Sequence, residues 1–169
     1  VAFATSIAAQ GAPGGPYARP RGSYEVDTTR SIMVPMRDGV RLATDVYRPK
    51  GVDGPLPTIL IRLPYNKAAY RAATIPASFF ASHGYAVVTQ DIRGKYGSEG
   101  EYVMNRPLRG PLNPTNVDHA TDTYDTIDWL VKNIPETNGK VGILGISYDG
   151  FLPLMALFNP HPALKVSVP

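Results

Sequence analysis

Polar and apolar residues alternate along an early part of the chain. Two alternating stretches, residues 31–36 and 40–47, flank Asp38-Gly39, a dipeptide that is typical of tight hairpin turns. Alternation places successive side chains on opposite faces of a strand. The pattern therefore predicts an antiparallel hairpin with one solvent-exposed face. That face would carry Arg41, Ala43, Asp45 and Tyr47.

Short runs that are almost entirely apolar follow the hairpin. They cover residues 58–62, 85–89, 140–146 and 164–168 and predict strands. For residues 58–62 and 85–89 the composition predicts strands that are covered on both faces. Helical segments separate most of them, so the sheet should be largely parallel and, with the hairpin, mixed. The predicted fold is a single α/β domain over residues 31–169.

Two of the three expected helices are short. The first covers residues 76–83, with Pro76 in its first turn and Gly84 at its end. The last follows Ser147 and contains Pro153, which a helix tolerates best in its first turn. Its expected core stripe is Phe151, Leu154, Met155 and Phe158.

The middle helix has the clearest pattern. Residues 115–118 resemble a capping box, and apolar residues then recur at steps of three and four up to residue 134. The acidic residues lie mostly off this stripe, which indicates a solvated acidic face rather than a metal site. They are Asp118, Asp122, Asp125 and Asp128.

Composition excludes several classes of function. The chain has 169 residues, of which 43% are hydrophobic and 18% charged, as in a globular protein with a core. The net charge of +3 comes without a long basic run, so nucleic-acid binding is not indicated. The absence of cysteine excludes disulfides, thiolate chemistry and a cysteine zinc site. No apolar stretch is long enough to cross a membrane.

Residues 1–30 differ from the rest of the chain. Residues 1–9 are small and apolar and resemble the tail of a secretory signal peptide, which predicts a periplasmic or secreted protein. A disordered N-terminal arm is the alternative. Residues 10–24 are rich in glycine and proline and are interpreted as an extended arm.

The candidate chemistry centres on Ser147. An apolar run ends at this serine, glycines lie two positions before it and three after it (Gly145 and Gly150), and a helical segment follows. Such a strand–turn–helix elbow presents a nucleophilic hydroxyl beside free N–H groups at a helix N-terminus. The common elbow has glycine two positions after the serine, where this chain has Asp149. An ordinary turn that happens to contain serine is the alternative.

Several motifs together resemble one family. The stretch Gly145-Ile-Ser-Tyr-Asp-Gly150 is similar to the elbow of α-amino acid ester hydrolases, whose relatives include bacterial cocaine esterase and the Xaa-Pro dipeptidyl peptidases. Residues 64–67 (Pro-Tyr-Asn-Lys) and 91–100 (Asp-x-Arg-Gly followed by Ser-Glu-Gly) resemble two loops of this family, and residues 102–121 resemble the ester hydrolases in particular. The resemblance runs from residue 31 to residue 169.

The resemblance implies an α/β-hydrolase fold and acyl transfer through an acyl-enzyme. Ser147 would be the nucleophile, and the backbone N–H of Tyr148 and the phenol of Tyr65 would form the oxyanion hole. Asp91 and Arg93 would fix loops as an ion pair or as backbone caps. The implied substrates are α-amino acid esters and α-amino β-lactam antibiotics. The family is typically homo-oligomeric, and neither a metal nor an organic cofactor is implied.

A serine nucleophile also needs a base, which this fold supplies after the serine. Only Asp149 and His161 follow Ser147 as candidates, and the intervening helix would carry His161 about 15 Å away. His83 and His119 are expected to be surface or capping residues. The triad acid and histidine are therefore expected beyond this chain, which would be an N-terminal fragment and inactive alone. A related esterase, a glutaryl-cephalosporin acylase, a dipeptidyl peptidase or a non-catalytic interaction module are the alternatives.

Overall fold

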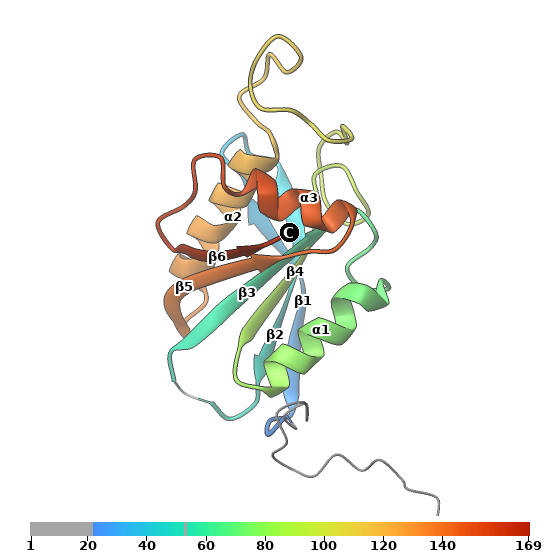
Figure 1. The fold of residues 1–169 in the computed structure, drawn as a ribbon. Helices are drawn as coiled ribbons and strands as arrows, with labels where there is room; N and C mark the ends of the chain where they lie inside the picture. Colours follow the sequence, from blue (N-terminus) through green and yellow to red (C-terminus); the bar gives the residue numbers. More distant parts are fainter. Residues whose placement is uncertain (1–21, 53) are drawn as a thin grey trace, which may run out of the picture.

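The computed structural model describes residues 22–52 and 54–169, which form a mixed six-stranded sheet with three helices (Figure 1). The strands are β1 (Val26–Pro35), β2 (Arg41–Pro49), β3 (Leu56–Leu63), β4 (Ala86–Asp91), β5 (Thr137–Leu144) and β6 (Leu164–Val168). The helices are α1 (Arg71–Ser82), α2 (His119–Asn133) and α3 (Tyr148–Met155). The expected signal remnant and most of the expected arm lie outside the described residues.

The strand order along the sheet is β1-β2-β4-β3-β5-β6. The β1–β2 and β2–β4 pairs are antiparallel, and the remaining pairs are parallel. The predicted α/β class and the mixed, mostly parallel sheet are confirmed. Because β3, β4 and β5 run in the same direction, their carboxyl ends meet at one edge, where reactive groups collect in such sheets.

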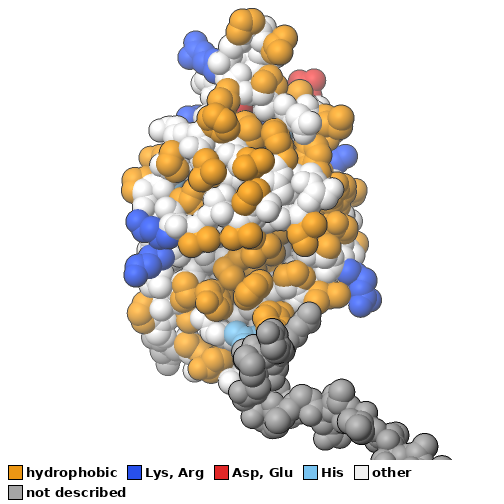
Figure 2. Space-filling model, in the orientation of Figure 1, with side chains coloured by type: hydrophobic (Ala, Val, Ile, Leu, Met, Phe, Trp, Pro, Cys, Tyr) orange, Lys and Arg blue, Asp and Glu red, His pale blue; other side chains and the backbone are white. Residues whose placement is uncertain are grey.

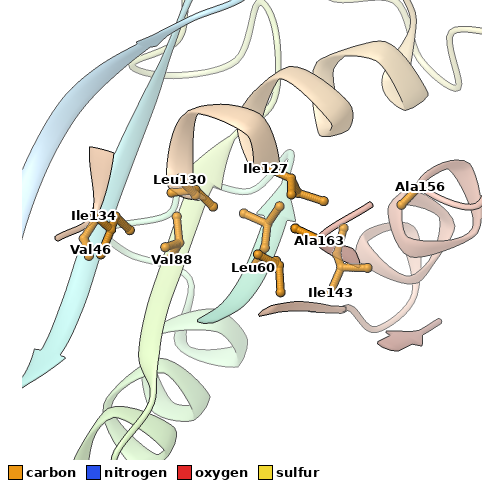
Figure 3. Close-up of a cluster of buried hydrophobic side chains, with 10 residues drawn as sticks. Val46, Leu60, Val88, Ile127, Leu130, Ile134, Ile143, Ala156 and Ala163 are labelled. Atoms are coloured by element: carbon orange, nitrogen blue, oxygen red, sulfur yellow. The ribbon is translucent and has the colours of Figure 1, made fainter. Parts of the chain in front are cut away.

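Helix α2 covers one face of the sheet. Ile127 and Leu130 of this helix, and Ile134 directly after it, pack on Val46, Leu60, Val88 and Ile143 of the strands (Figure 3). The capping box that starts this helix is formed by Asp118 and Thr121, each of which accepts the other's backbone N–H at 2.8 Å. The prediction of a box at residues 115–118 was therefore wrong by three residues.

The acidic residues of α2 do not form a solvated face. Asp118 and Asp122 are buried, and the Asp122 carboxylate bonds Arg93 at 2.6 Å. Asp125 binds Arg37 at 2.8 Å, so Asp128 is the most open of the four. The expectation of a solvated face was wrong because Arg93, from the loop between β4 and α2, and Arg37, from the turn between β1 and β2, pair with this face.

Helix α1 covers part of the opposite face. Its alanines at 73, 77 and 81 pack on Tyr47, Ile61 and Val87. Lys67 covers Asp45, and the loop after β4 covers Ala43. β2 is therefore buried on both faces from Leu42 to Tyr47, and the predicted solvent-exposed face is wrong. The helix also begins at Arg71, so Pro76 lies inside it rather than in its first turn. Gly84, with φ of 91°, ends it as predicted.

Helix α3 differs from its predicted packing. Leu152, Pro153 and Met155 are buried, whereas Leu154 and Phe158 are about half exposed. The elbow fixes where this eight-residue helix begins, and position 152 rather than 151 then faces the sheet. Pro153 is the sixth residue of the helix, beyond the first turn, so the Asp149 carbonyl lacks its usual helical N–H partner.

An apolar part of the sheet remains uncovered beside α1. A hollow of about 270 Å³ lies over β3, β5 and β6, and Val166 and Val168 on its border are 55% and 52% exposed. Figure 2 shows hydrophobic side chains gathered in the middle of this view. Among the described residues, no helix combines the length and the apolar character needed to cross a bilayer.

Candidate active site

Ser147 lies at a sharp turn between β5 and α3. Its backbone has φ of 62° and ψ of −124°, a strained conformation for a residue with a side chain. The residue is solvent-exposed, although Gly145 before it and Asp149 and Gly150 after it are buried. This is the geometry of a nucleophile elbow, in which the turn lifts the hydroxyl away from the sheet.

Gly145 makes this turn possible. A Cβ atom at position 145 would lie 2.0 Å from the carbonyl oxygen of Asp149, which is backbone and cannot move aside. At Gly150 the nearest atom to an added Cβ is 3.3 Å away, so the second glycine is under a weaker constraint. The close approach to the Asp149 carbonyl explains why position 145 needs glycine. Two positions after the serine, where the common elbow has glycine, this chain accommodates the side chain of Asp149.

The phenol of Tyr65 lies beside the Ser147 hydroxyl. Tyr65 belongs to the loop after β3, and its phenol lies near enough to the Ser147 side chain to interact with it. Burial and the nearby charge of Asp149 raise the pKa of the phenol above its usual value, and the interaction with Ser147 offsets part of this rise. The phenol therefore stays neutral at pH 7 and can donate a hydrogen bond to an oxyanion.

Tyr148 is the first residue of α3. A first helical N–H has no carbonyl partner within the helix, so it can face an anion beside Ser147. The Tyr148 phenol instead accepts the backbone N–H of Asn105 at 2.9 Å. Burial, as the largest cause, raises the pKa of this phenol to about 12. The structure thus brings Ser147, Tyr65 and Tyr148 together at one edge of the sheet.

Asp149 lies directly beneath this group. The residue is 3% exposed, and its Oδ1 atom has no hydrogen-bond partner among the described residues. Burial raises the pKa of the carboxyl to about 7. A carboxyl that is largely neutral below this pH adds little negative charge where an oxyanion would form.

Asp91 and Arg93 hold loops as expected, but with separate partners. The Asp91 carboxylate accepts the N–H groups of Lys67 and Gly97 at 2.8 and 3.3 Å. Arg93 binds Asp122 and Asp38 instead, at 2.6 and 2.7 Å. The two residues therefore cap and bridge loops at the site and do not pair with each other.

The contacts of the three histidines involve residues other than Ser147. His161 contacts Asp128 at 3.5 Å and accepts the Ala163 N–H. His119 is buried edge-on against Phe151, and burial lowers the pKa of its ring to about 3. His83 caps α1 just before β4 begins, at the opposite edge of the sheet. Within the described residues, no group of three or more acidic or histidine side chains could hold a metal ion.

One pair at the site was missed by the sequence analysis. Lys67 and Asp45 form a buried ion pair at 2.7 Å, directly behind the loop that carries Tyr65. The sequence did contain one sign of this pair, because Asp45 is an acidic residue in the middle of a largely apolar strand. The alternating pattern assigned Asp45 to a solvent-exposed face, which concealed it.

Comparison with known proteins agrees with this geometry. The cocaine esterase of Rhodococcus sp. (strain MB1 Bresler) is 40% identical over 151 residues, which are 88% of this chain and 24% of the esterase. A solved structure of α-amino acid ester hydrolase is 50% identical with a TM-score of 0.78, over 98% of this chain and 28% of that one. An aminopeptidase from a marine sediment archaeon (Thaumarchaeota archaeon) is 47% identical with a TM-score of 0.76, over 90% of this chain and 27% of that one.

The chain thus spans about a quarter of the length of these relatives. The relatives are hydrolases of the esterase and peptidase type, and the resemblance noted from the motifs is confirmed. The family model described as X-Pro dipeptidyl-peptidase (S15 family) matches residues 38–169, which include the hairpin turn, the elbow and all three helices. This chain belongs to the S15 family.

Proposed function

We propose that the chain supplies the nucleophile and the oxyanion hole of a serine hydrolase that acts on α-amino acid esters and α-amino β-lactam antibiotics. The observation that carries this proposal is the exposed Ser147 on a strained elbow, with the neutral phenol of Tyr65 beside it. The substrate class is supported by the 50% identity to an α-amino acid ester hydrolase.

In the proposed reaction, the Ser147 oxygen attacks the carbonyl carbon of an α-amino acyl group. Its proton passes to a histidine base, which is expected outside residues 1–169. The Tyr65 O–H and the Tyr148 N–H donate to the oxyanion that forms. The alcohol or amine then leaves with the proton. Water or an acceptor amine attacks the acyl-enzyme, releases the acyl group and restores the serine hydroxyl.

Fluorophosphonate labelling of the protein in its full natural length tests this role. We expect a single adduct on the Ser147 peptide, because the reagent needs an activated serine in an oxyanion hole. Ser147→Ala should abolish the adduct. Ser78→Ala, which removes an exposed serine from the regular helix α1, should leave labelling intact. Labelling that survives Ser147→Ala would contradict the proposal.

A second comparison tests the substrate class. We expect phenylglycine methyl ester to be hydrolysed at least about tenfold faster than phenylacetic acid methyl ester, which lacks the α-amino group. Equal rates would favour a general esterase, as the likeness to cocaine esterase suggests. Preferential cleavage of an Xaa-Pro nitroanilide would favour the dipeptidyl peptidase activity that the family description names.

A further inference from the structure

The loop that carries Tyr65 is held by a charged pair in the interior of the protein. The Lys67 ammonium donates to Asp45 Oδ1 at 2.7 Å, and both residues are almost fully buried, at 5% and 0% exposure. Asp45 lies on β2, two strands away from β3 in the sheet order. The Lys67 side chain therefore ties the β3 loop to a strand that does not pair with β3.

Further contacts fix Asp45 itself. The backbone N–H of Ser31 donates to Asp45 Oδ1 at 2.8 Å, from a bulge in β1 between Thr29 and Ile32. Arg30 reaches the other carboxylate oxygen at 3.3 Å. Two donors thus set the position of the carboxylate before Lys67 is considered, which makes Asp45 a rigid anchor.

The backbone of Lys67 has a separate support. Its N–H donates to Asp91 Oδ1 at 2.8 Å, at the end of β4. Nearby, the N–H of Ile92 donates to the carbonyl of Leu63, the last residue of β3. The loop is consequently attached to β4 at its start and again at Lys67.

Tyr65 lies between these two attachments. Asn66, in the left-handed conformation with φ of 70°, is the only residue between Tyr65 and Lys67. On its other side the Tyr65 ring contacts Tyr70 at a centroid distance of 4.9 Å. With so short a connection, a displacement of Lys67 would move the phenol away from Ser147.

We propose that Lys67, through its buried ion pair with Asp45, is a positioning residue that holds the Tyr65 phenol in the oxyanion hole. This inference rests on the proposed serine hydrolase function. A buried ion pair gains little net stability because both charges lose their hydration. Precise placement of an oxyanion donor, in contrast, has a large effect on rate.

The kinetic test uses the full natural protein and phenylglycine methyl ester. We expect Lys67→Met to lower kcat by about tenfold to a hundredfold while KM changes by less than about twofold. In a Tyr65→Phe background, the same substitution should lower kcat by less than about twofold, because no phenol remains to be placed. Lys132→Met, which removes an exposed lysine from α2, is the control and should leave kcat unchanged.

A double variant without either charge separates a loss of positioning from a loss of folding. Lys67→Met alone leaves the Asp45 charge buried without its cation, whereas Asp45→Asn combined with Lys67→Met removes both charges. The double variant should show the same loss of kcat and the same dependence on Tyr65. An equal loss of kcat in the Tyr65→Phe background, or no loss at all, would overturn the proposal.

Titration of Tyr65 gives a readout that does not need activity. The difference in tyrosinate absorbance between the protein and its Tyr65→Phe variant reports the pKa of this phenol, which burial and Asp149 raise. We expect the double variant to lower that pKa towards the usual value. If turnover survives Ser147→Ala, the proposed function fails, and this titration then tests separately whether the ion pair of Lys67 with Asp45 positions Tyr65. An unchanged pKa of Tyr65 would overturn that positioning role.

Discussion

At the scale of single residues, Gly145 carries the strictest requirement of the site. An alanine there would place its Cβ 2.0 Å from the Asp149 carbonyl oxygen. We expect Gly145→Ala to lower the free energy of unfolding by about 1 to 3 kcal/mol and to abolish fluorophosphonate labelling, because the elbow must open. Chemical denaturation and intact mass measure the two effects.

Gly142 provides the matched control for this prediction. It lies on β5, three residues before Gly145, and a Cβ added there would meet nothing closer than 3.7 Å, an ordinary contact. Gly142→Ala should retain both stability and labelling. Equal effects of the two substitutions would show that the turn does not depend on the close approach at Gly145.

The sequence was sufficient to find the candidate residues that the structure brings together, but not their support. Ser147, Tyr65 and Tyr148 lie in short motifs that are recognisable within a few positions. Lys67 and Asp45 are 22 residues apart, and their pairing depends on how β2 and the β3 loop meet in the folded sheet. No local pattern carries that information, so the pair could be found only in three dimensions.

At the scale of elements, the cap of α2 offers a clear test. Asp118 accepts the Thr121 N–H at 2.8 Å, and Thr121 accepts the Asp118 N–H at the same distance. We expect Asp118→Ala to lower the free energy of unfolding by about 1 kcal/mol, because the helix loses this acceptor. Asp118→Asn keeps an acceptor oxygen and should lose much less. Equal losses in urea denaturation would assign the effect to the charge.

The sequence predicted which elements exist better than which faces they bury. Every expected strand and helix is present, because runs of apolar residues and turn signals are local. The burial of β2 and of Asp122 depends instead on α1 and on the loop that carries Arg93, which pack over them from elsewhere in the chain. These partners decide the exposure of a face, and periodicity does not specify them.

At the scale of the whole molecule, the positions of the histidines limit what residues 1–169 can do alone. His119 is buried against Phe151, His161 contacts Asp128 and His83 lies at the opposite sheet edge. We therefore expect the isolated chain to hydrolyse phenylglycine methyl ester no faster than its Ser147→Ala variant. Turnover that requires Ser147 would show that a base is available within this chain.

The bulge in β1 has a consequence beyond the site. β1 is the outermost strand on its side of the sheet, and such strands offer free N–H and C=O groups to other chains. At the bulge Ser31 adopts φ of 56° and turns its N–H inward to Asp45, so this donor is not available to an invading strand. We therefore expect Asp45, the proposed anchor of the Tyr65 loop, also to hinder edge-to-edge pairing of β1 at this bulge.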